Sequence, residues 1–280
     1  MHLSPETLQE LIRLIQQWTG LALGTDKAYL LRHRLAPVVR SCGFDGFDEL
    51  LLRLQAGGAT RIQDAVIEAI TTKETSFFRD PWLFDALLQH VLPTLAKART
   101  ARRPIRIWSA GTSTGQEAYS LAMIVREFID SARHELAEKD VNIIASDISG
   151  EAIDAAKTGV YSRQEVARGL SEPRLRRFFE PHGEGWRASE ALRRLLQFRT
   201  FNLLRPMAEL GAFDLILCRN VLIYFDEPTR ARVCRGLSAA LADGGWLALG
   251  SAESLMGIDA GLESVAFGRA FIYRKPIASA

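Results

Sequence analysis

The sequence predicts an α/β protein in which an all-helical unit precedes a larger domain built on a parallel sheet covered by helices. In residues 1–75 apolar residues recur at helical spacing. From Ile105 onward, short apolar runs alternate with longer helical patterns, which is typical of a parallel sheet with helices on its faces. The length of 280 residues exceeds the usual size of one hydrophobic core, so we expect two domains.

The first domain, residues 1–75, is expected to contain four helices. Ser4 can cap a helix whose first turn holds Pro5 and Glu6. Three further helical patterns end at glycines or at a pair of threonines, and they cover residues 26–40, 47–54 and 62–70.

The second domain, residues 76–280, is expected to hold the sheet. Its candidate strands are residues 105–109, 141–146, 196–201, 213–218, 246–249 and 267–273. Helical patterns lie between them at residues 116–129, 151–157 and 227–241. Residues from about 160 to 195 do not fit a single crossover connection, so we interpret them as an insertion.

Composition excludes several classes of function. A net charge of +2 is too small to indicate binding to nucleic acid or to a membrane surface. Cys42, Cys218 and Cys234 form no C-x-x-C pair and indicate neither disulfides nor a metal site. The N-terminus lacks the pattern of a signal peptide, and no apolar run is long enough to span a membrane. We therefore expect a cytoplasmic protein without a metal. We also expect a monomer, although nothing in the composition decides whether the protein self-associates.

A small-residue turn follows the first candidate strand and opens a helix. The turn, WSAGTSTG at residues 108–115, would let a ligand approach backbone N–H groups. It is neither a phosphate loop nor a G-x-G-x-x-G fingerprint. Asp147 ends the next strand, where an acid can accept the hydroxyls of a ribose. The alternative is that Asp147 only caps the helix that starts near Gly150.

Four ordered motifs resemble the CheR family of chemoreceptor methyltransferases. They are TTKETSFFR at 71–79, WSAGTSTGQEAYS at 108–120, ASDI at 145–148 and CRNVLIYFD at 218–226. The likeness covers nearly the whole chain. It implies a Rossmann-like, S-adenosylmethionine-dependent methyltransferase domain with an inserted small β-subdomain, together with an all-α N-terminal domain.

The resemblance also implies roles for individual residues. Thr75 and Arg79 would contact the methionine end of S-adenosylmethionine, and Glu117 its amino group. The remaining implied roles are ribose binding by Asp147, adenine contacts by Asn202 and Leu203, a floor beneath the methionyl part formed by Arg219 and Asn220, and a methyl-transfer channel lined by Tyr224. Arg79 and Tyr224 are the expected catalytic residues.

Alternatives and departures accompany these assignments. Arg79 could instead pair with Asp80 or Asp85, and Glu117 could merely favour a helix N-terminus. The family usually has Asn at the position of Lys73, Glu at that of Gln116 and Pro at that of Ala118. We therefore do not transfer the family's side-chain contact with the cofactor to Lys73, and whether Lys73 contacts the cofactor stays open.

The implied reaction is methylation of glutamate side chains on the cytoplasmic domain of transmembrane chemoreceptors, with S-adenosylhomocysteine as product. A glutamate with a pKa of about 4.3 is already ionised at neutral pH, so no general base is needed. The scattered histidines, His134 among them, agree with this expectation. Two alternatives remain: a methyltransferase for RNA or a small molecule, and a non-catalytic S-adenosylmethionine-binding regulator.

Two features bear on the receptor. Arg32 and Arg40 lie eight positions apart on one predicted helix and share roughly one face, with His33 nearby and Arg34 less aligned. Such a face is usually just solvated, but the resemblance suggests that it docks an acidic receptor bundle. The loop at residues 180–187 looks shorter than in family members that bind a receptor's C-terminal pentapeptide, so we expect pentapeptide independence.

Overall fold

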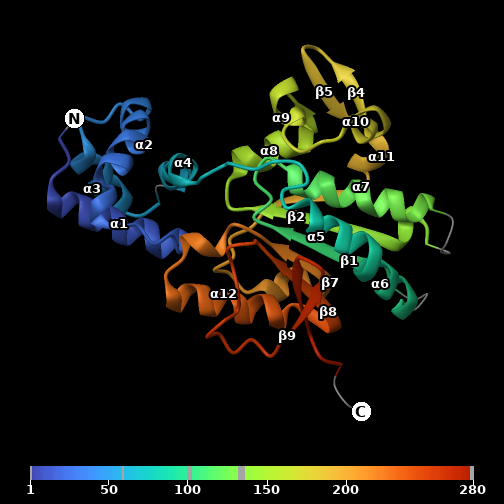
Figure 1. Ribbon diagram of the computed structural model, residues 1–280. Coiled ribbons are helices and arrows are strands. Elements are labelled where there is room, and N and C mark those ends of the chain that lie inside the picture. The colour runs from blue at the N-terminus through green and yellow to red at the C-terminus, as the bar shows by residue number, and fades with distance from the viewer. Residues whose placement is uncertain (1, 59, 100–102, 132–135, 278–280) are drawn as a thin grey trace. The chain divides into compact units, whose positions relative to one another are not determined.

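The computed structural model describes residues 2–58, 60–99, 103–131 and 136–277, and the chain divides into two compact units (Figure 1). One unit comprises Met1–Thr72 and Tyr224–Thr229, and the other comprises Lys73–Ile223 and Arg230–Ala280. Residues 224–229 are therefore grouped with the N-terminal helices, although they are far away in the sequence. The domain boundary that we placed between residues 75 and 76 stays a prediction.

The N-terminal unit is helical, as predicted. Ser4 caps α1 by accepting a hydrogen bond from the backbone N–H of Thr7 at 3.1 Å, and Gly20 ends this helix in the left-handed conformation with φ of 74°. The helices are α1 (Pro5–Thr19), α2 (Ala28–Ser41), α3 (Phe47–Gln55) and α4 (Thr60–Ile70), with a 3₁₀ turn at Thr25–Lys27 before α2.

One apolar core holds these helices together. Each helix buries one face, so the apolar positions that recur at helical spacing in the sequence meet in the middle of the unit. The core includes Leu11, Ile15, Leu35, Val39, Leu50 and Val66, all at most 1% exposed.

In the described part of the second unit, seven strands form one sheet in the order β6-β2-β1-β7-β8-β10-β9. The first five of these strands run parallel, whereas β10 pairs antiparallel with both β8 and β9. The strands are β1 (Ile105–Ala110), β2 (Val141–Asp147), β6 (Leu196–Thr200), β7 (Phe213–Cys218), β8 (Leu241–Leu249), β9 (Glu263–Phe267) and β10 (Ala270–Arg274).

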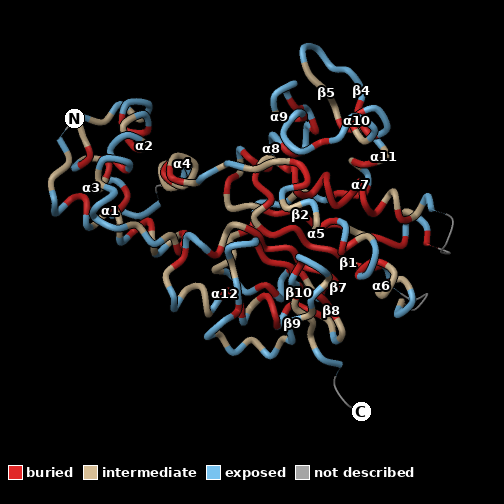
Figure 2. Tube along the Cα trace, viewed as in Figure 1, coloured by how far each residue is buried: buried red, intermediate tan, exposed pale blue. Residues whose placement is uncertain are grey.

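Helices cover both faces of this sheet. Figure 1 shows α7 (Gln116–Asp130) and α12 (Glu227–Ala239) on opposite sides of the strands. The other helices are α5 (Pro81–Ala86), a π-helical turn at Leu87–Val91, α6 (Leu92–Ala98) and α8 (Gly150–Thr158). Buried residues concentrate in the strands and in α7, as Figure 2 shows. Because β1 and β7 are almost wholly buried, their loops start from rigid positions.

The insertion is a small β-subdomain, as predicted. A three-stranded antiparallel sheet has the order β3-β5-β4, with β3 (Val160–Tyr161), β4 (Phe179–His182) and β5 (Gly185–Ala188). Three short helices accompany it: α9 (Arg163–Ala167), α10 (Glu172–Phe178) and α11 (Glu190–Arg193). Tyr161 links the subdomain to the main sheet, because its hydroxyl donates to the carbonyl of Thr114 at 2.8 Å.

The prediction of a single strand at 267–273 was wrong. The structure has an antiparallel hairpin in which Phe267 pairs with Ala270, so Gly268 and Arg269 form a two-residue turn. Gly268 has φ of 60°, a conformation that glycine adopts without strain, and such a residue favours a tight hairpin. In addition, β8 begins at Leu241 rather than at Trp246, and α12 ends at Ala239.

Candidate functional site

The predicted site residues follow strands that are neighbours in the sheet. The turn at 111–115 follows β1, Asp147 ends β2, Asn202 and Leu203 follow β6, and Arg219 and Asn220 follow β7. Since these four strands are parallel, their carboxyl ends lie at one edge of the sheet. The structure thus brings these residues together at the edge where open α/β sheets bind ligands.

Backbone hydrogen bonds fix the turn after β1. The N–H groups of Gly111 and Thr112 both donate to the carbonyl of Ser146 on β2, at 2.8 and 2.9 Å. Gly111 has φ of 79°, and a β-carbon there would lie 2.3 Å from Cγ2 of Val221, so only glycine fits. The hydroxyl of Thr112 is buried without a hydrogen-bond partner among the described residues. A buried hydroxyl of this kind can receive a ligand atom without displacing a protein contact.

Asp147 closes the turn from the side of β2. Its carboxylate accepts hydrogen bonds from the N–H of Ser113 at 2.8 Å and from the N–H of Ser149 at 3.0 Å. The alternative that Asp147 caps the next helix was wrong, because Ser149 is the N-cap of α8 and accepts from Ala152. The carboxylate is half-buried and retains acceptor capacity for a ligand.

The loop after β6 is tied to Asp147. The N–H of Phe201 donates to the carbonyl of Asp147 at 2.8 Å, which places Asn202 and Leu203 next to that residue along the sheet edge. The Asn202 side chain accepts a hydrogen bond from the N–H of Leu204 at 2.9 Å, and both predicted residues are half-buried. They lie beyond Asp147 on the side away from the glycine turn, because β6 is the edge strand of the sheet.

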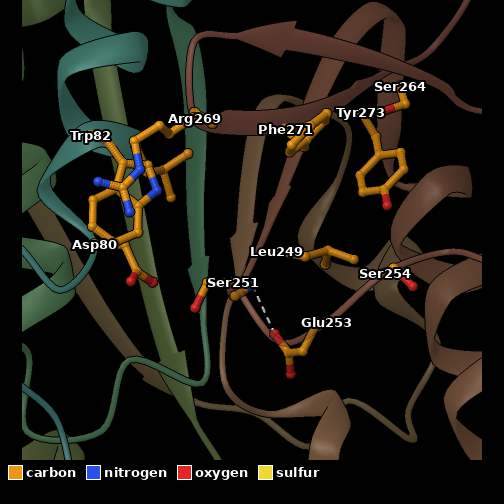
Figure 3. Close-up of a pocket in the computed structure, with 13 residues that line it drawn as sticks. Asp80, Trp82, Leu249, Ser251, Glu253, Ser254, Ser264, Arg269, Phe271 and Tyr273 are labelled. Carbon is orange, nitrogen blue, oxygen red and sulfur yellow. Dashed lines mark hydrogen bonds between the residues drawn. The ribbon is translucent and has the colours of Figure 1, made fainter.

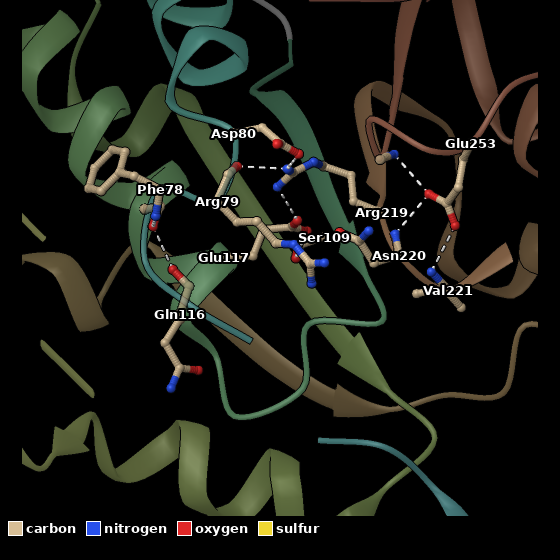
Figure 4. Close-up of polar contacts among 12 residues, drawn as sticks. Phe78, Arg79, Asp80, Ser109, Gln116, Glu117, Arg219, Asn220, Val221 and Glu253 are labelled. Atoms are coloured by element: carbon tan, nitrogen blue, oxygen red, sulfur yellow. Dashed lines mark hydrogen bonds and ion pairs between the residues drawn. The ribbon is translucent and has the colours of Figure 1, made fainter. Parts of the chain in front are cut away.

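A buried ionic cluster lies on the other side of the glycine turn (Figure 4). Arg219, whose side chain is 2% exposed, donates to Glu117 at 3.1 Å, to Asp80 at 2.7 Å and to the carbonyl of Arg79 at 2.7 Å. The second oxygen of Glu117 accepts from the hydroxyl of Ser109 at 2.8 Å. We call Arg219, Glu117 and Asp80 the Arg219 cluster.

The charges of the Arg219 cluster do not cancel. Two carboxylates surround one guanidinium, which leaves a formal charge of −1 at the edge of the sheet. Burial raises the pKa of Glu117 above its ordinary value, although Arg219 and Ser109 act in the opposite direction. A cation bound beside Glu117 would relieve this cost. The cluster therefore suits a positively charged ligand.

Arg79 is held by strained backbone on both sides. Phe78 and Asp80 have φ of 46° and 59°, a region that non-glycine residues rarely occupy outside functional sites. The proposed pairing of Arg79 with Asp80 or Asp85 was wrong: Asp80 pairs with Arg219, and the Arg79 guanidinium makes no hydrogen bond within the described residues. Figure 4 shows its side chain directed away from the Asp80 carboxylate.

Other members of the 73–79 segment have local roles. The ammonium of Lys73 pairs with Glu151 at 2.8 Å, and its carbonyl accepts from the hydroxyl of Ser113 at 2.9 Å. Thr75 is half-buried on the same segment. Gln116, where the family usually has Glu, accepts from the hydroxyl of Thr114 at 2.8 Å. The contact between Ser113 and Lys73 attaches the segment to the glycine turn.

Sequence reasoning missed Glu253. Its carboxylate accepts hydrogen bonds from four backbone N–H groups, those of Asn220, Val221, Ile223 and Gly250, at 2.8 to 3.3 Å. The available signal for Glu253 in the sequence was an acidic residue shortly after a predicted strand. The sequence does not show that most of its hydrogen-bond donors lie in a different loop.

A pocket of about 390 Å³ opens beside the Arg219 cluster (Figure 3). Its walls come from the start of α5, the end of β8 and from β10, and they include Asp80, Trp82, Glu253 and Arg269. The Arg269 guanidinium stacks over the Trp82 ring at 4.6 Å. None of the residues that we predicted for the site lines this pocket, which lies on the β8 side of them.

Tyr224 belongs to the unit of N-terminal helices, unlike the other predicted site residues. Its carbonyl accepts from the N–H of Ala22 at 2.8 Å, and the residue is 38% exposed. Its catalytic role stays a prediction.

Three further observations concern a cysteine, metal ligands and membrane-spanning helices. Cys218 is fully buried, and burial raises the pKa of its thiol well above the ordinary value, so it is an inert core residue. Over the described ranges, no group of three His, Cys, Asp or Glu residues is placed to hold a metal ion. Within the same ranges no helix is both long and apolar enough to cross a membrane.

Comparison with known families identifies the class to which both units belong. Residues 73–270 match the family model described as the S-adenosylmethionine-binding domain of CheR methyltransferases. With its Rossmann-like sheet, the second unit is thus the catalytic domain type of an S-adenosylmethionine-dependent methyltransferase. Residues 6–71 match the all-alpha domain of the same methyltransferases. The chain belongs to the CheR family of chemotaxis methyltransferases.

Individual relatives extend over almost the full length. The chain is 40% identical to chemotaxis protein methyltransferase 1 of Pseudomonas aeruginosa over 95% of this chain and 96% of that protein. It is 38% identical to chemotaxis protein methyltransferase 1 of Vibrio cholerae, over 97% of this chain and 98% of that protein. A Pseudomonas putida relative, chemotaxis protein methyltransferase Cher2, is also 38% identical, over 93% and 94% of the two chains. The predicted family and fold class are confirmed.

Proposed function

We propose that this protein transfers the methyl group of S-adenosylmethionine to glutamate side chains on the cytoplasmic domain of chemoreceptors. The products are a glutamate methyl ester and S-adenosylhomocysteine. The observation that carries the proposal is the row of ligand-ready groups along one sheet edge, ending at a cluster with a net charge of −1. This charge suits a cofactor that carries a sulfonium and an ammonium group.

In strand order, the site residues would contact successive parts of the cofactor. Asn202 and Leu203 would flank the adenine, Asp147 would accept from the ribose hydroxyls, and Glu117 would meet the ammonium group. Thr75 and the free guanidinium of Arg79 would contact the carboxylate of the methionine end. Arg219 and Asn220 would form the floor under the methionyl part.

The chemistry needs little more than alignment. When bound, the cofactor supplies an electrophilic methyl on a sulfonium. A carboxylate oxygen of the acceptor would form the new C–O bond as the C–S bond breaks, and the electron pair of the C–S bond would pass to sulfur. The acceptor is already ionised at neutral pH, so the protein contributes position and exclusion of water rather than a base. Tyr224 is the residue that we expect to line the path of the methyl group.

A charged face of α2 supports a protein acceptor. Arg32, His33 and Arg40 are exposed, whereas Arg34 donates to the carbonyl of Ile70 at 2.5 Å and stabilises the helical unit. We infer that Arg32 and Arg40 dock an acidic receptor bundle. Unchanged receptor methylation at low ionic strength after Arg32→Glu and Arg40→Glu would exclude this docking role.

The decisive experiment uses labelled S-adenosylmethionine and isolated receptor cytoplasmic domains. We expect a base-labile methyl ester on the receptor, and less of it with Asp147→Asn when the cofactor is below saturation. Cofactor binding in calorimetry without ester formation would instead indicate a non-catalytic regulator, and absence of binding would refute both. In a separate titration, we expect no binding of a free C-terminal receptor pentapeptide, because residues 180–187 form only the short β4–β5 hairpin.

A further inference from the structure

We propose that Glu253 is a positioning residue for the methyl-transfer site: its carboxylate holds the loop after β7 in the conformation that presents Arg219 and Asn220. This inference rests on the proposed function. Glu253 lies in the loop after β8, on the strand next to β7, so one side chain connects two neighbouring loops at the ligand-binding edge.

The geometry divides the four N–H donors evenly between the two oxygens. Oε2 accepts from Asn220 and Gly250, both at 2.8 Å, whereas Oε1 accepts from Val221 at 3.0 Å and Ile223 at 3.3 Å. Only a carboxylate supplies two acceptor atoms without a donor. Three of the four amides belong to the loop after β7, which otherwise would present unpaired N–H groups.

The loop needs this support because its backbone is unfavourable. Asn220 has φ of 58°, in the left-handed region. Gly250 is also constrained, since a β-carbon there would lie 2.7 Å from Oε2 of Glu253 and 3.0 Å from the N of Asn220. The two loops therefore pack together with the carboxylate between them.

The effect reaches the glycine turn. The N–H of Val221 donates to Glu253, and the Val221 side chain packs against Gly111. A β-carbon on Gly111 would lie 2.3 Å from Cγ2 of Val221. A shift of Val221 would move into the turn after β1. Glu253 thus controls two of the elements that we assign to cofactor binding, although it need not touch the cofactor.

The test compares Glu253→Gln with Asp214→Asn. Glutamine keeps the shape, but its NH₂ group would face two N–H donors. Asp214 is the matched control: it lies at the opposite end of β7, is 9% exposed, and accepts from the N–H of Arg106 at 2.9 Å and from Arg103. Both substitutions remove a carboxylate that accepts from backbone N–H at one end of β7, four such groups for Glu253 and one for Asp214, which also accepts from the Arg103 guanidinium.

We expect Glu253→Gln to raise the Kd for S-adenosylmethionine roughly tenfold or more and to lower kcat, with the KM for the receptor within about twofold of the original value. Hydrogen exchange should accelerate at the amides of residues 220, 221, 223 and 250. Asp214→Asn should destabilise the protein comparably but leave the Kd and these amides unchanged. Glu253→Asp, which keeps the charge on a shorter side chain, should give an intermediate Kd and serves if the glutamine variant does not fold.

Unchanged cofactor affinity and amide exchange in Glu253→Gln would overturn the proposal, as would equal losses in Asp214→Asn. The same holds if Glu253→Asp, used as the substitute, behaves like the unsubstituted protein. Failure of the proposed function looks different, because the unsubstituted protein would then bind S-adenosylmethionine without forming a receptor methyl ester. The exchange measurement tests Glu253 in either case.

Discussion

Replacement of Arg219 by methionine should cost more than any other single change in the Arg219 cluster. The substitution keeps the aliphatic stem but removes the hydrogen bonds to Glu117, Asp80 and the carbonyl of Arg79. It leaves two carboxylates, 11% and 16% exposed, without their cation. Removing one partner of a buried ion pair typically costs about 3–5 kcal/mol, because the remaining charge stays desolvated.

This free energy translates into a measurable change in melting temperature. For domains of roughly 150–250 residues, 1 kcal/mol shifts Tm by about 2–4 °C, so we expect Arg219→Met to lower Tm by roughly 6–20 °C. Circular dichroism melts would measure it, and calorimetric titration with S-adenosylmethionine should show weaker binding. Addition of Glu117→Gln to the variant should recover part of the lost stability, because it removes one uncompensated carboxylate.

Arg99→Met is the matched control for this prediction. Arg99 pairs with Asp140, and their side chains are 19% and 11% exposed. Among the described residues, the Nε of Arg99 has no hydrogen-bond partner, and neither has that of Arg219. Arg99 precedes β1 and Asp140 directly precedes β2, so this pair lies at the amino ends of these parallel strands, at the opposite edge of the sheet from the predicted site. Arg99→Met should reduce stability without weakening cofactor binding. A Tm for Arg219→Met within about 2 °C of the unsubstituted protein would refute the reasoning.

Three further predictions concern Glu117, Gly111 and Asp147. Burial raises the pKa of Glu117 above its ordinary value of 4.5, so the folded protein binds a proton at Glu117 more tightly than the unfolded chain does. The free energy of unfolding should therefore fall as pH rises above 4.5. Glu117→Gln should remove that component of the pH dependence in urea titrations. Gly111→Ala should destabilise by about 1–3 kcal/mol, because φ is positive and the added carbon meets Val221, and urea melts that match those of the original protein would contradict this. Asp147→Asn should weaken binding of S-adenosylmethionine by about tenfold, because an amide has one acceptor oxygen where the carboxylate has two for the N–H of Ser113 and the ribose hydroxyls. Equal Kd values for the two proteins in calorimetry would contradict the assigned role.

The sequence was sufficient for the parts of the fold that depend on local patterns. Capping by Ser4, the apolar periodicity of the N-terminal helices and the buried runs of β1 and β7 are each encoded within a few neighbouring residues. The hairpin at the end of the sheet was missed because residues 263–274 form a nearly continuous apolar and aromatic pattern in which the single turn glycine, Gly268, resembles an interruption within one strand.

The position of a candidate site residue was predictable where it follows directly from the strand that precedes it. Asp147 is the example: the end of β2 fixes its place, whatever the rest of the chain does. Contacts between distant segments were not predictable in this way. Asp80 meets Arg219 across 139 positions, and Glu253 meets Asn220 across 33, and nothing in either local sequence specifies its partner.

Charge placement explains why this site can join a cationic donor to an anionic acceptor. The net −1 of the Arg219 cluster attracts the donor, but the same charge would repel an acceptor carboxylate that approached it directly. Arg79 lies between these demands, because its carbonyl accepts from Arg219 while its guanidinium is exposed and makes no hydrogen bond in the described part of the chain. A cation at that position offsets the negative cluster towards the solvent side. Under the proposed function, an acceptor carboxylate would therefore meet the ionised groups of the site after the sulfonium is in place, and we expect an ordered reaction in which the cofactor binds first.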